Sequence, residues 1–204
     1  MEKTKFEILS ELIKADRSYR RFDEKDRIES ETISDIVELA RYCASGRNLQ
    51  SMRYYIINDV ETCDMIFPHL KWAGYLPEWD GPEEGERPAA YLIQCNDKNI
   101  TKNYLCDDGL QLQAITLGAV AKGLGCCIIK SFNALKLKEI LNIPDHLEAL
   151  YVLAIGKPVE KVEIEDLKGE EGEDIKYYRT ADGVHHVPKR LLKDLIVNIQ
   201  PSIP

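Results

Sequence analysis

Four short apolar segments, each separated from the next by a segment of helical character, limit the possible folds of this chain more than any other feature. They cover residues 54–57, 89–95, 126–130 and 149–155, and their length and apolar character predict strands. Strands that alternate with helices are typical of a sheet with helices packed against it, because each layer buries its apolar side on the other. We therefore predict a single domain over residues 1–204, of the α+β class, with one mixed central sheet flanked by helices.

The helical segments are recognised by apolar residues spaced three and four apart and by their capping residues. Residues 2–15 predict an amphipathic first helix, in which Phe6, Leu9 and Ile13 share a face. Ser30 is the predicted N-cap of a second helix, because its hydroxyl can accept a backbone N–H there. Further helices are predicted over residues 61–67, 102–122, 134–142 and 189–197.

Two segments show neither the apolar spacing of a helix nor the apolar run of a strand. Residues 69–88 are irregular but contain Trp72, Tyr75 and Trp79 among Gly, Pro and acidic residues. Long irregular segments with aromatic residues are more often lids or binding loops than inert surface, so we predict a lid here, with these three aromatics in the wall of a substrate pocket. Residues 157–184 are polar and acidic, and we predict an extended, solvated connection.

Charge and composition exclude several classes of function. The formal net charge is −8 and no cluster of Lys and Arg offsets it, so the chain repels nucleic acids and anionic membranes. No apolar run is long enough to span a membrane, and the first residues lack the core of a signal peptide. The six cysteines have no spacing suited to zinc. They predict reduced, mostly buried thiols, and hence a cytoplasmic protein without a metal site.

Two polar clusters have the chemistry to hold an anionic, planar ligand. Arg17, Ser18 and Arg20 follow the first helix, and two guanidinium groups with a hydroxyl between them suit a phosphate. Basic residues at a helix end also commonly complement the helix dipole. Residues 45–50 contain Asn and Gln side chains that can bind the mixed donor and acceptor edge of a pyrimidine-like ring, although such loops also cap themselves.

Other common sites are not indicated. The sequence has no Gly-rich dinucleotide motif and no phosphate loop, because Gly123-Leu124-Gly125 precedes a strand rather than a helix. Ser131 does not lie in the G-x-S-x-G setting of a hydrolase nucleophile. His185 and His186 lack ligand partners at helical spacing and are predicted to be a surface pair. No catalytic acid, base or nucleophile is predicted.

Five short motifs follow one another along nearly the whole chain. They are an R-S-x-R-x-F motif, an Asn- and Gln-containing loop, a G-L-G turn, an I-G-x-P turn and a basic pair, at residues 17–22, 44–52, 123–125, 155–158 and 189–190. Each motif is loosely matched, but five in the same order are much more specific than any one. In this order they resemble the FMN-dependent nitroreductase family.

The resemblance implies an intertwined homodimer with an FMN at each subunit interface. It places Arg17, Ser18 and Arg20 at the phosphate and ribityl chain, helped by Lys189 and Arg190. It also implies that Ser45, Gly46 and Asn48 of the other subunit approach the flavin ring. The backbone of Lys130 and Ser131 would lie near flavin N5.

The activity that the resemblance implies is an FMN-dependent NAD(P)H oxidoreductase. NADH or NADPH would deliver hydride to flavin N5, and a nitroaromatic, quinone or activated alkene would then take it in a ping-pong cycle. Ser51-Met52 replaces the usual Pro-Trp, and Lys130 stands where many members carry Gly or Glu. Three alternatives stay open: another flavin reaction on the same fold, such as dehalogenation, desaturation or flavin breakdown; a non-catalytic FMN-binding protein; and a helical adaptor without flavin.

Overall fold

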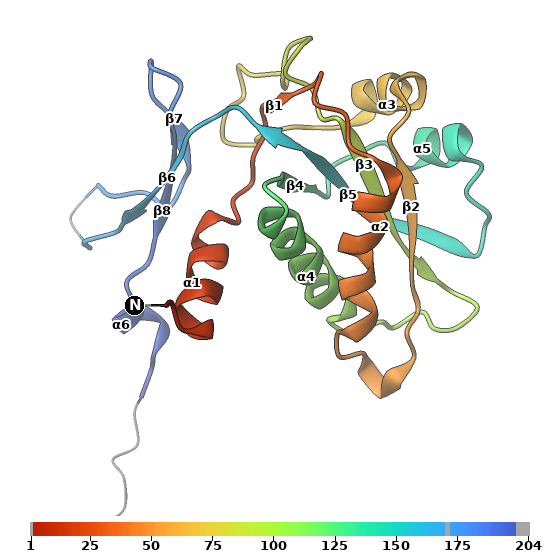
Figure 1. The fold of residues 1–204 in the computed structure, drawn as a ribbon, viewed down its shortest axis with the longest axis horizontal. Helices are drawn as coiled ribbons and strands as arrows, with labels where there is room; N and C mark the ends of the chain where they lie inside the picture. Colours follow the sequence, from red (N-terminus) through yellow and green to blue (C-terminus); the bar gives the residue numbers. More distant parts are fainter. Residues whose placement is uncertain (1, 170–171, 199–204) are drawn as a thin grey trace, which may run out of the picture. The chain divides into compact units, whose positions relative to one another are not determined.

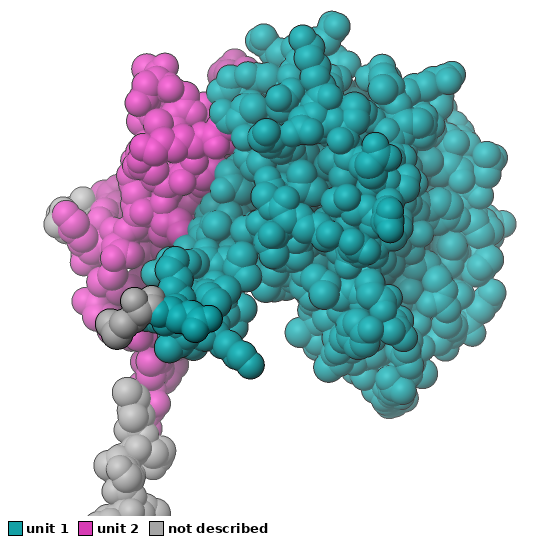
Figure 2. All heavy atoms as spheres, viewed as in Figure 1, with its two compact units in different colours: residues 1–73, 79–159 teal, residues 74–78, 160–204 magenta. Residues whose placement is uncertain are grey.

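The computed structural model of the protein describes residues 2–169 and 172–198. These residues form two compact units (Figure 2). The larger unit runs to Ala73 and continues from Trp79 to Val159, and the smaller unit contains Gly74–Glu78 and the described residues from Glu160 onward. Each unit has a sheet of its own. The prediction of a single sheet is therefore wrong, while the helix-covered sheet of the larger unit is confirmed.

The larger unit contains a sheet of five strands in the order β1-β5-β3-β2, with β4 also paired to β5 (Figure 1). The strands are β1 (Phe22–Asp23), β2 (Met52–Ile57), β3 (Ala90–Asp97), β4 (Gly125–Ile129) and β5 (Leu147–Pro158). All four predicted strands are present, and β5 is longer than expected.

The named strand pairs of this sheet are all antiparallel, which corrects the prediction of a mixed sheet. β3 and β4 are joined by a helix and run in the same direction, as expected of such a crossover. However, β5 inserts between them and pairs with both in the opposite direction. Within the described residues of the larger unit, a parallel contact is made only by the isolated bridge from Ser18 to Cys126.

Helices cover both faces of this sheet (Figure 1). On one face, Ile36 of α2 (Ser30–Glu38) and Ile115 of α4 (Asp107–Ala121) share a buried core cluster with Leu92 of β3. On the other face, Cys63 of α3 (Val60–Ile66) lies beside Tyr91, and α3 contacts α5 (Ala134–Leu141). β3 is consequently buried along almost its whole length, as expected of a central strand.

Two helices begin at other residues than predicted. The N-cap of α2 is Glu29, and the Ser30 hydroxyl accepts a hydrogen bond from the Asn58 amide at 2.9 Å instead of capping the helix. α4 begins five residues later than the predicted Lys102. Upstream, Asn103 N–H donates to the Thr101 hydroxyl and the Leu105 N–H donates to the Asn103 side chain. These local bonds compete with helix formation.

Side chains cap the start of two other helices. α1 (Lys5–Ala15) starts with a capping box between Thr4 and Glu7. Asn133 accepts the Lys136 N–H at the start of α5. α1 nevertheless contains no buried residue in the part of the chain that the structure describes.

β2 is an edge strand and not the buried strand that its apolar residues predict. Met52 and Ile57 at its ends are buried, whereas Arg53 and Ile56 between them are exposed. No described strand pairs with its outer edge. Residues 70–88 contain no helix or strand, in agreement with the predicted irregular segment, which starts within a short 3-10 helix (Phe67–His69).

The smaller unit holds three short strands in the order β6-β8-β7, which are β6 (Val162–Asp166), β7 (Tyr178–Arg179) and β8 (His185–Lys189). Two of these strands, β6 and β7, thus lie within the predicted extended connection. His186 Nδ1 lies 2.6 Å from a Glu165 carboxylate oxygen, and the Tyr178 ring stacks on His186 at 4.8 Å. The predicted final helix shrinks to four residues, α6 (Leu192–Leu195).

No helix among the described residues is both long and apolar enough to cross a membrane. All six cysteines are free thiols, and four of them are buried, as predicted. Burial raises the pKa of the Cys63 thiol to about 11 and that of Cys95 to about 12. These thiols therefore stay protonated and behave as small apolar side chains.

Candidate functional site

The segment that carries the candidate phosphate ligands is attached to the start of β4. Tyr19 N–H donates to the Cys126 carbonyl at 2.9 Å, and Ser18 forms a bridge to the same residue. A side chain on Gly125 would not fit, because a Cβ there would lie 2.5 Å from both the Tyr19 ring and Pro158. The G-L-G turn thus lets the segment approach the strand closely.

Asp16 holds the same segment against α4. Its carboxylate accepts hydrogen bonds from the Gln113 amide at 2.6 Å and from the Thr116 hydroxyl at 2.7 Å. Charge-assisted bonds of this kind are shorter and stronger than neutral ones. The residues after Asp16 are therefore fixed from two sides, by a helix and by a strand.

The three candidate phosphate ligands differ in what they can reach. Arg17 donates to the Ile13 carbonyl at 2.8 Å, while its buried Nε has no hydrogen-bond partner among the described residues. Ser18 is exposed. Arg20 is only 7% exposed and donates to the Ser18 carbonyl at 3.1 Å. The partly exposed Arg17 and the exposed Ser18 can contact an anion directly, whereas Arg20 supports the backbone at Ser18.

The loop after the second helix is held by the first residue of α4. The buried Asp107 carboxylate accepts the Ser45 hydroxyl at 2.6 Å and the Gly46 N–H at 2.8 Å. Arg47 and Asn48 have φ values of 53° and 56°, which non-Gly residues rarely adopt. Asp107 therefore holds a strained loop, and the Ser45 hydroxyl and Gly46 N–H are used in hydrogen bonds within the protein. The Asn48 side chain is exposed and can contact a ligand.

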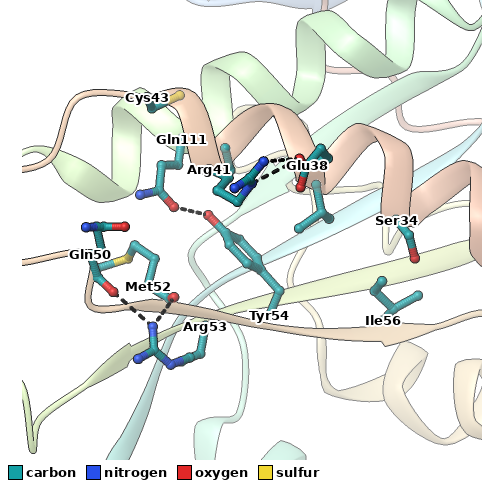
Figure 3. A pocket seen from close by; sticks show the side chains of 12 residues that line it. Ser34, Glu38, Arg41, Cys43, Gln50, Met52, Arg53, Tyr54, Ile56 and Gln111 are labelled. Carbon is teal, nitrogen blue, oxygen red and sulfur yellow. Dashed lines mark hydrogen bonds and ion pairs between the residues drawn. The ribbon is translucent and has the colours of Figure 1, made fainter.

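A pocket of about 350 Å³ opens beside this loop, between α2, β2 and α4 (Figure 3). In its wall the Tyr54 hydroxyl donates to Gln111 at 2.6 Å and accepts from Gln94 at 3.1 Å, and burial raises the pKa of Tyr54. Gln111 is 6% exposed, and its amide nitrogen has no partner among the described residues. The pocket thus offers one free amide donor, and Gln50 lies at its rim (Figure 3).

Lys130 and Ser131, which were predicted to lie near a flavin ring, follow the opposite end of β4. Lys130 is exposed, and its ammonium group donates to the Tyr151 hydroxyl at 3.3 Å. This hydrogen bond raises the pKa of Lys130, so the side chain is a cation across the physiological range. The backbone of the next residue is fixed too, because the Ser131 carbonyl accepts the Lys71 N–H at 2.9 Å.

β4 therefore connects the predicted phosphate-binding segment to the predicted ring-binding segment. Ser18 lies beside Cys126, and Lys130 follows four residues later. An extended strand rises roughly 3.3 Å per residue, so the two places are about 13 Å apart. Phosphate-type donors thus lie at one end of the strand and a cation at the other. Such a separation suits a cofactor with a phosphate at one end and a reactive ring at the other.

The remaining candidates divide between the two units. Lys189 ends β8 and Arg190 follows it, and both are exposed in the smaller unit. Tyr75 belongs to the same unit, where its ring packs on Tyr177 at 4.9 Å. Trp72 and Trp79 belong to the larger unit.

The two tryptophans have different surroundings. Trp72 is 8% exposed and packs against Phe67, with ring centroids 6.1 Å apart. It also fills the space above Gly81, so it has the environment of a core residue. Trp79 is half-buried. Of the two, Trp79 is the better candidate for a movable wall.

The model of the nitroreductase family matches residues 13–79 and 87–157, which is more than half of the chain. The chain belongs to the nitroreductase family. Its fold is similar to solved structures at low sequence identity. An FMN-dependent nitroreductase from Clostridium difficile is 20% identical over 74% of this chain and 87% of that chain, with a TM-score of 0.59.

Two further solved structures have the same fold. A protein named as a nitroreductase in complex with FMN, from Exiguobacterium sibiricum, is 20% identical over 78% of this chain and 91% of its own, with a TM-score of 0.62. A protein named as an NADH dehydrogenase/NAD(P)H nitroreductase, from Parabacteroides distasonis, is 20% identical over 84% and 96%, with a TM-score of 0.62. The nitroreductase-like α+β fold predicted from the sequence is thereby confirmed.

Proposed function

We propose that this nitroreductase-family protein is an FMN-dependent oxidoreductase that takes hydride from NADH or NADPH and passes it to nitroaromatic, quinone or activated-alkene acceptors. The observation that carries the proposal is the alignment of phosphate-type donors and a cation at opposite ends of β4. The names of the similar structures from Clostridium difficile, Exiguobacterium sibiricum and Parabacteroides distasonis support FMN and NAD(P)H.

In this proposal the arginine segment binds the cofactor phosphate. Arg17 is a partly exposed guanidinium side chain and Ser18 is an exposed hydroxyl side chain, a combination that matches phosphate oxygens. Arg20 acts by holding the backbone of Ser18 through its carbonyl. These residues bind and orient, and they transfer no proton.

At the ring end, FMN supplies the hydride chemistry once it is bound. The Lys130 and Ser131 backbone faces N5 in our proposal, and its position is fixed by the bond between Ser131 and Lys71. The Lys130 ammonium provides a positive charge where negative charge develops on reduction. Donor and acceptor would use the same space in turn, in a ping-pong cycle.

We further propose that the active form is an intertwined homodimer in which Ser45, Gly46 and Asn48 approach the flavin of the other subunit. α1 has no buried residue, and Phe6 on its apolar face is 78% exposed. Exposed apolar faces of this kind are typical of protein interfaces. Light scattering is expected to give twice the chain mass, and a monomer that binds FMN fully would contradict the shared site.

The visible spectrum of the purified protein, before and after addition of FMN and removal of the excess, tests the proposal directly. We expect a yellow protein with about one flavin per chain, since the cofactor carries the chemistry. NADH or NADPH should bleach the bound flavin, and a quinone should restore its colour. A protein that stays colourless after FMN addition would overturn the oxidoreductase proposal.

Lys130→Met is expected to lower the midpoint potential of the bound flavin. The substitution removes a positive charge that favours the reduced, more negative ring. We expect a fall of tens of millivolts, since about 30 mV is a tenfold change in equilibrium for a two-electron couple. Spectroelectrochemistry measures this shift. Lys130→Arg keeps the charge and should retain the wild-type potential, and an unchanged potential in Lys130→Met would remove Lys130 from the mechanism.

Trp79→Ala is expected to change kcat/KM for at least one acceptor by about three- to tenfold, as loss of part of a pocket wall costs about 1 kcal/mol. Steady-state kinetics with a quinone and a nitroaromatic measure the effect. Trp72→Ala is the comparison, because its buried ring should affect the unfolding free energy instead. Equal kcat/KM values for all acceptors in Trp79→Ala would contradict the lid prediction.

A further inference from the structure

A small hollow lies next to the proposed ring end of the site, between residues 68–71 and 131–133. Its volume is about 310 Å³, at the lower end of the range for ligand pockets. Two backbone hydrogen bonds of 2.9 Å build it, from Lys71 N–H to the Ser131 carbonyl and from Asn133 N–H to the His69 carbonyl. The two segments are thus held together like a short antiparallel ladder, with Leu70 opposite Phe132.

This pairing brings four polar residues to the hollow. Lys71 lies opposite Ser131 across the ladder, and His69, the last residue of the 3-10 helix, lies opposite Asn133. All four line the hollow, together with Pro68, Leu70 and Phe132. An ammonium, an imidazole and a hydroxyl group are therefore present in its lining.

Lys71 gives the hollow a positive charge that no lining carboxylate balances. None of its lining residues is acidic, although the chain has 35 acidic against 27 basic residues. Lys71 forms no ion pair with any described residue, and neither the His69 ring nor the Ser131 hydroxyl has a hydrogen-bond partner there. By contrast, exposed lysines such as Lys122 and Lys136 are paired with carboxylates. The donors around the hollow are therefore available to a ligand.

We infer that this hollow binds the carboxylate of an anionic acceptor, with Lys71 supplying the charge and Ser131 and His69 the hydrogen bonds. The inference rests on the proposed function, because Ser131 is also part of the segment assigned to flavin N5. A group bound at Ser131 lies close to the ring, where the substituent of a small acceptor must be. The phosphates of a nicotinamide donor are several bonds further from its reacting carbon. The preferred acceptors are thus carboxylate-bearing nitroaromatics or alkenes.

A pair of acceptors that differ only in charge tests the inference. 4-Nitrobenzoate and 4-nitrobenzamide have nearly the same shape, and only the first carries a carboxylate. We expect the wild-type protein to favour the benzoate by about tenfold in kcat/KM, the effect of one charge-assisted hydrogen bond. Lys71→Met should abolish this preference with little change for the benzamide, and Lys71→Arg should restore it. Lys25→Met, at another exposed lysine, is the control and should keep the preference.

Binding without turnover separates this inference from the proposed function. Benzoate and benzamide are titrated into the isotope-labelled protein, and the backbone amide signals of Ser131 and Asn133 are followed by NMR. Shifts with benzoate that disappear in Lys71→Met support the hollow, even if the protein proves unable to oxidise NADH or NADPH. Equal kcat/KM ratios in wild type and Lys71→Met, or no shift with benzoate, overturn it. A Lys71→Met effect confined to the KM of NADPH would also overturn it, in favour of a donor phosphate.

Discussion

Replacing Asp107 by Ala is expected to lower the free energy of unfolding by about 3 kcal/mol, since hydrogen bonds to a charged group contribute about 1.5 kcal/mol or more each. The buried carboxylate accepts both the Ser45 hydroxyl and the Gly46 N–H. Without it, these donors lose their partner, and the left-handed backbone at Arg47 and Asn48 loses the contact that holds it. Urea unfolding followed by circular dichroism measures the loss.

The same substitution should weaken FMN binding. In the proposed dimer, Asn48 reaches the flavin only when its loop has the observed conformation. Loss of one ring contact corresponds to about a tenfold weaker Kd, which fluorescence titration with FMN measures. Asp108→Asn is the matched control, because this neighbour lies in the same helical turn but outside the Ser45 and Gly46 bonds. Equal stability and FMN affinity in Asp107→Ala and Asp108→Asn would show that the loop does not depend on Asp107.

Gly125→Ala is expected to cost about 2 kcal/mol of stability, within the usual range for overpacking. A Cβ at this position would lie 2.5 Å from Tyr19 and Pro158, so both must move. Displacing Tyr19 breaks its hydrogen bond to the Cys126 carbonyl and releases the arginine segment from β4. We therefore expect FMN binding to weaken together with stability, in the same unfolding and titration measurements.

Gly109 provides the matched control for this substitution. It lies in α4, and a Cβ there meets no atom within 4 Å. Gly109→Ala should leave FMN binding unchanged and raise stability by up to about 1 kcal/mol, because Ala is the better helix former. If Gly125→Ala binds FMN as tightly as wild type, the close approach of the arginine segment to β4 is not needed for the cofactor.

Local pattern predicted most elements of the larger unit. Periodicity located α1, α3 and α5 to within a few residues, and short apolar runs located β3, β4 and the centre of β5. These are the elements in which local preference and burial agree. The predictions failed where a competing interaction was stronger, as at the start of α4, where Thr101 and Asn103 bond to the backbone.

Long-range pairing explains the larger misses. β6 pairs with β8 across about twenty residues, with Val162 opposite His185, and no local pattern in an acidic segment indicates such a partner. The exposure of β2 likewise depends on strand order. Its apolar residues match a buried strand, but its place at the edge of the sheet leaves Ile56 exposed.

The residues of the candidate site were also only partly predicted from the sequence. Motif order pointed to Arg17, Ser18, Lys130 and Ser131, and the structure joins them along β4. Asp16 and Asp107 were missed, because an acidic residue beside or inside a helix is common and carries no mark of its role. Their partners are 61 to 100 residues away in sequence, so only the fold brings them together.

The sequence by itself determined the secondary structure of the larger unit, the family resemblance and the residue types able to hold a flavin phosphate, since these depend on periodicity, capping and motif order. Only the tertiary structure decided that β5 inserts between β3 and β4, that Asp107 holds the Ser45 loop, and that His69 and Lys71 meet Ser131 at one hollow. The physical reason is that such contacts join distant segments, and their energies depend on burial and geometry that no local pattern contains.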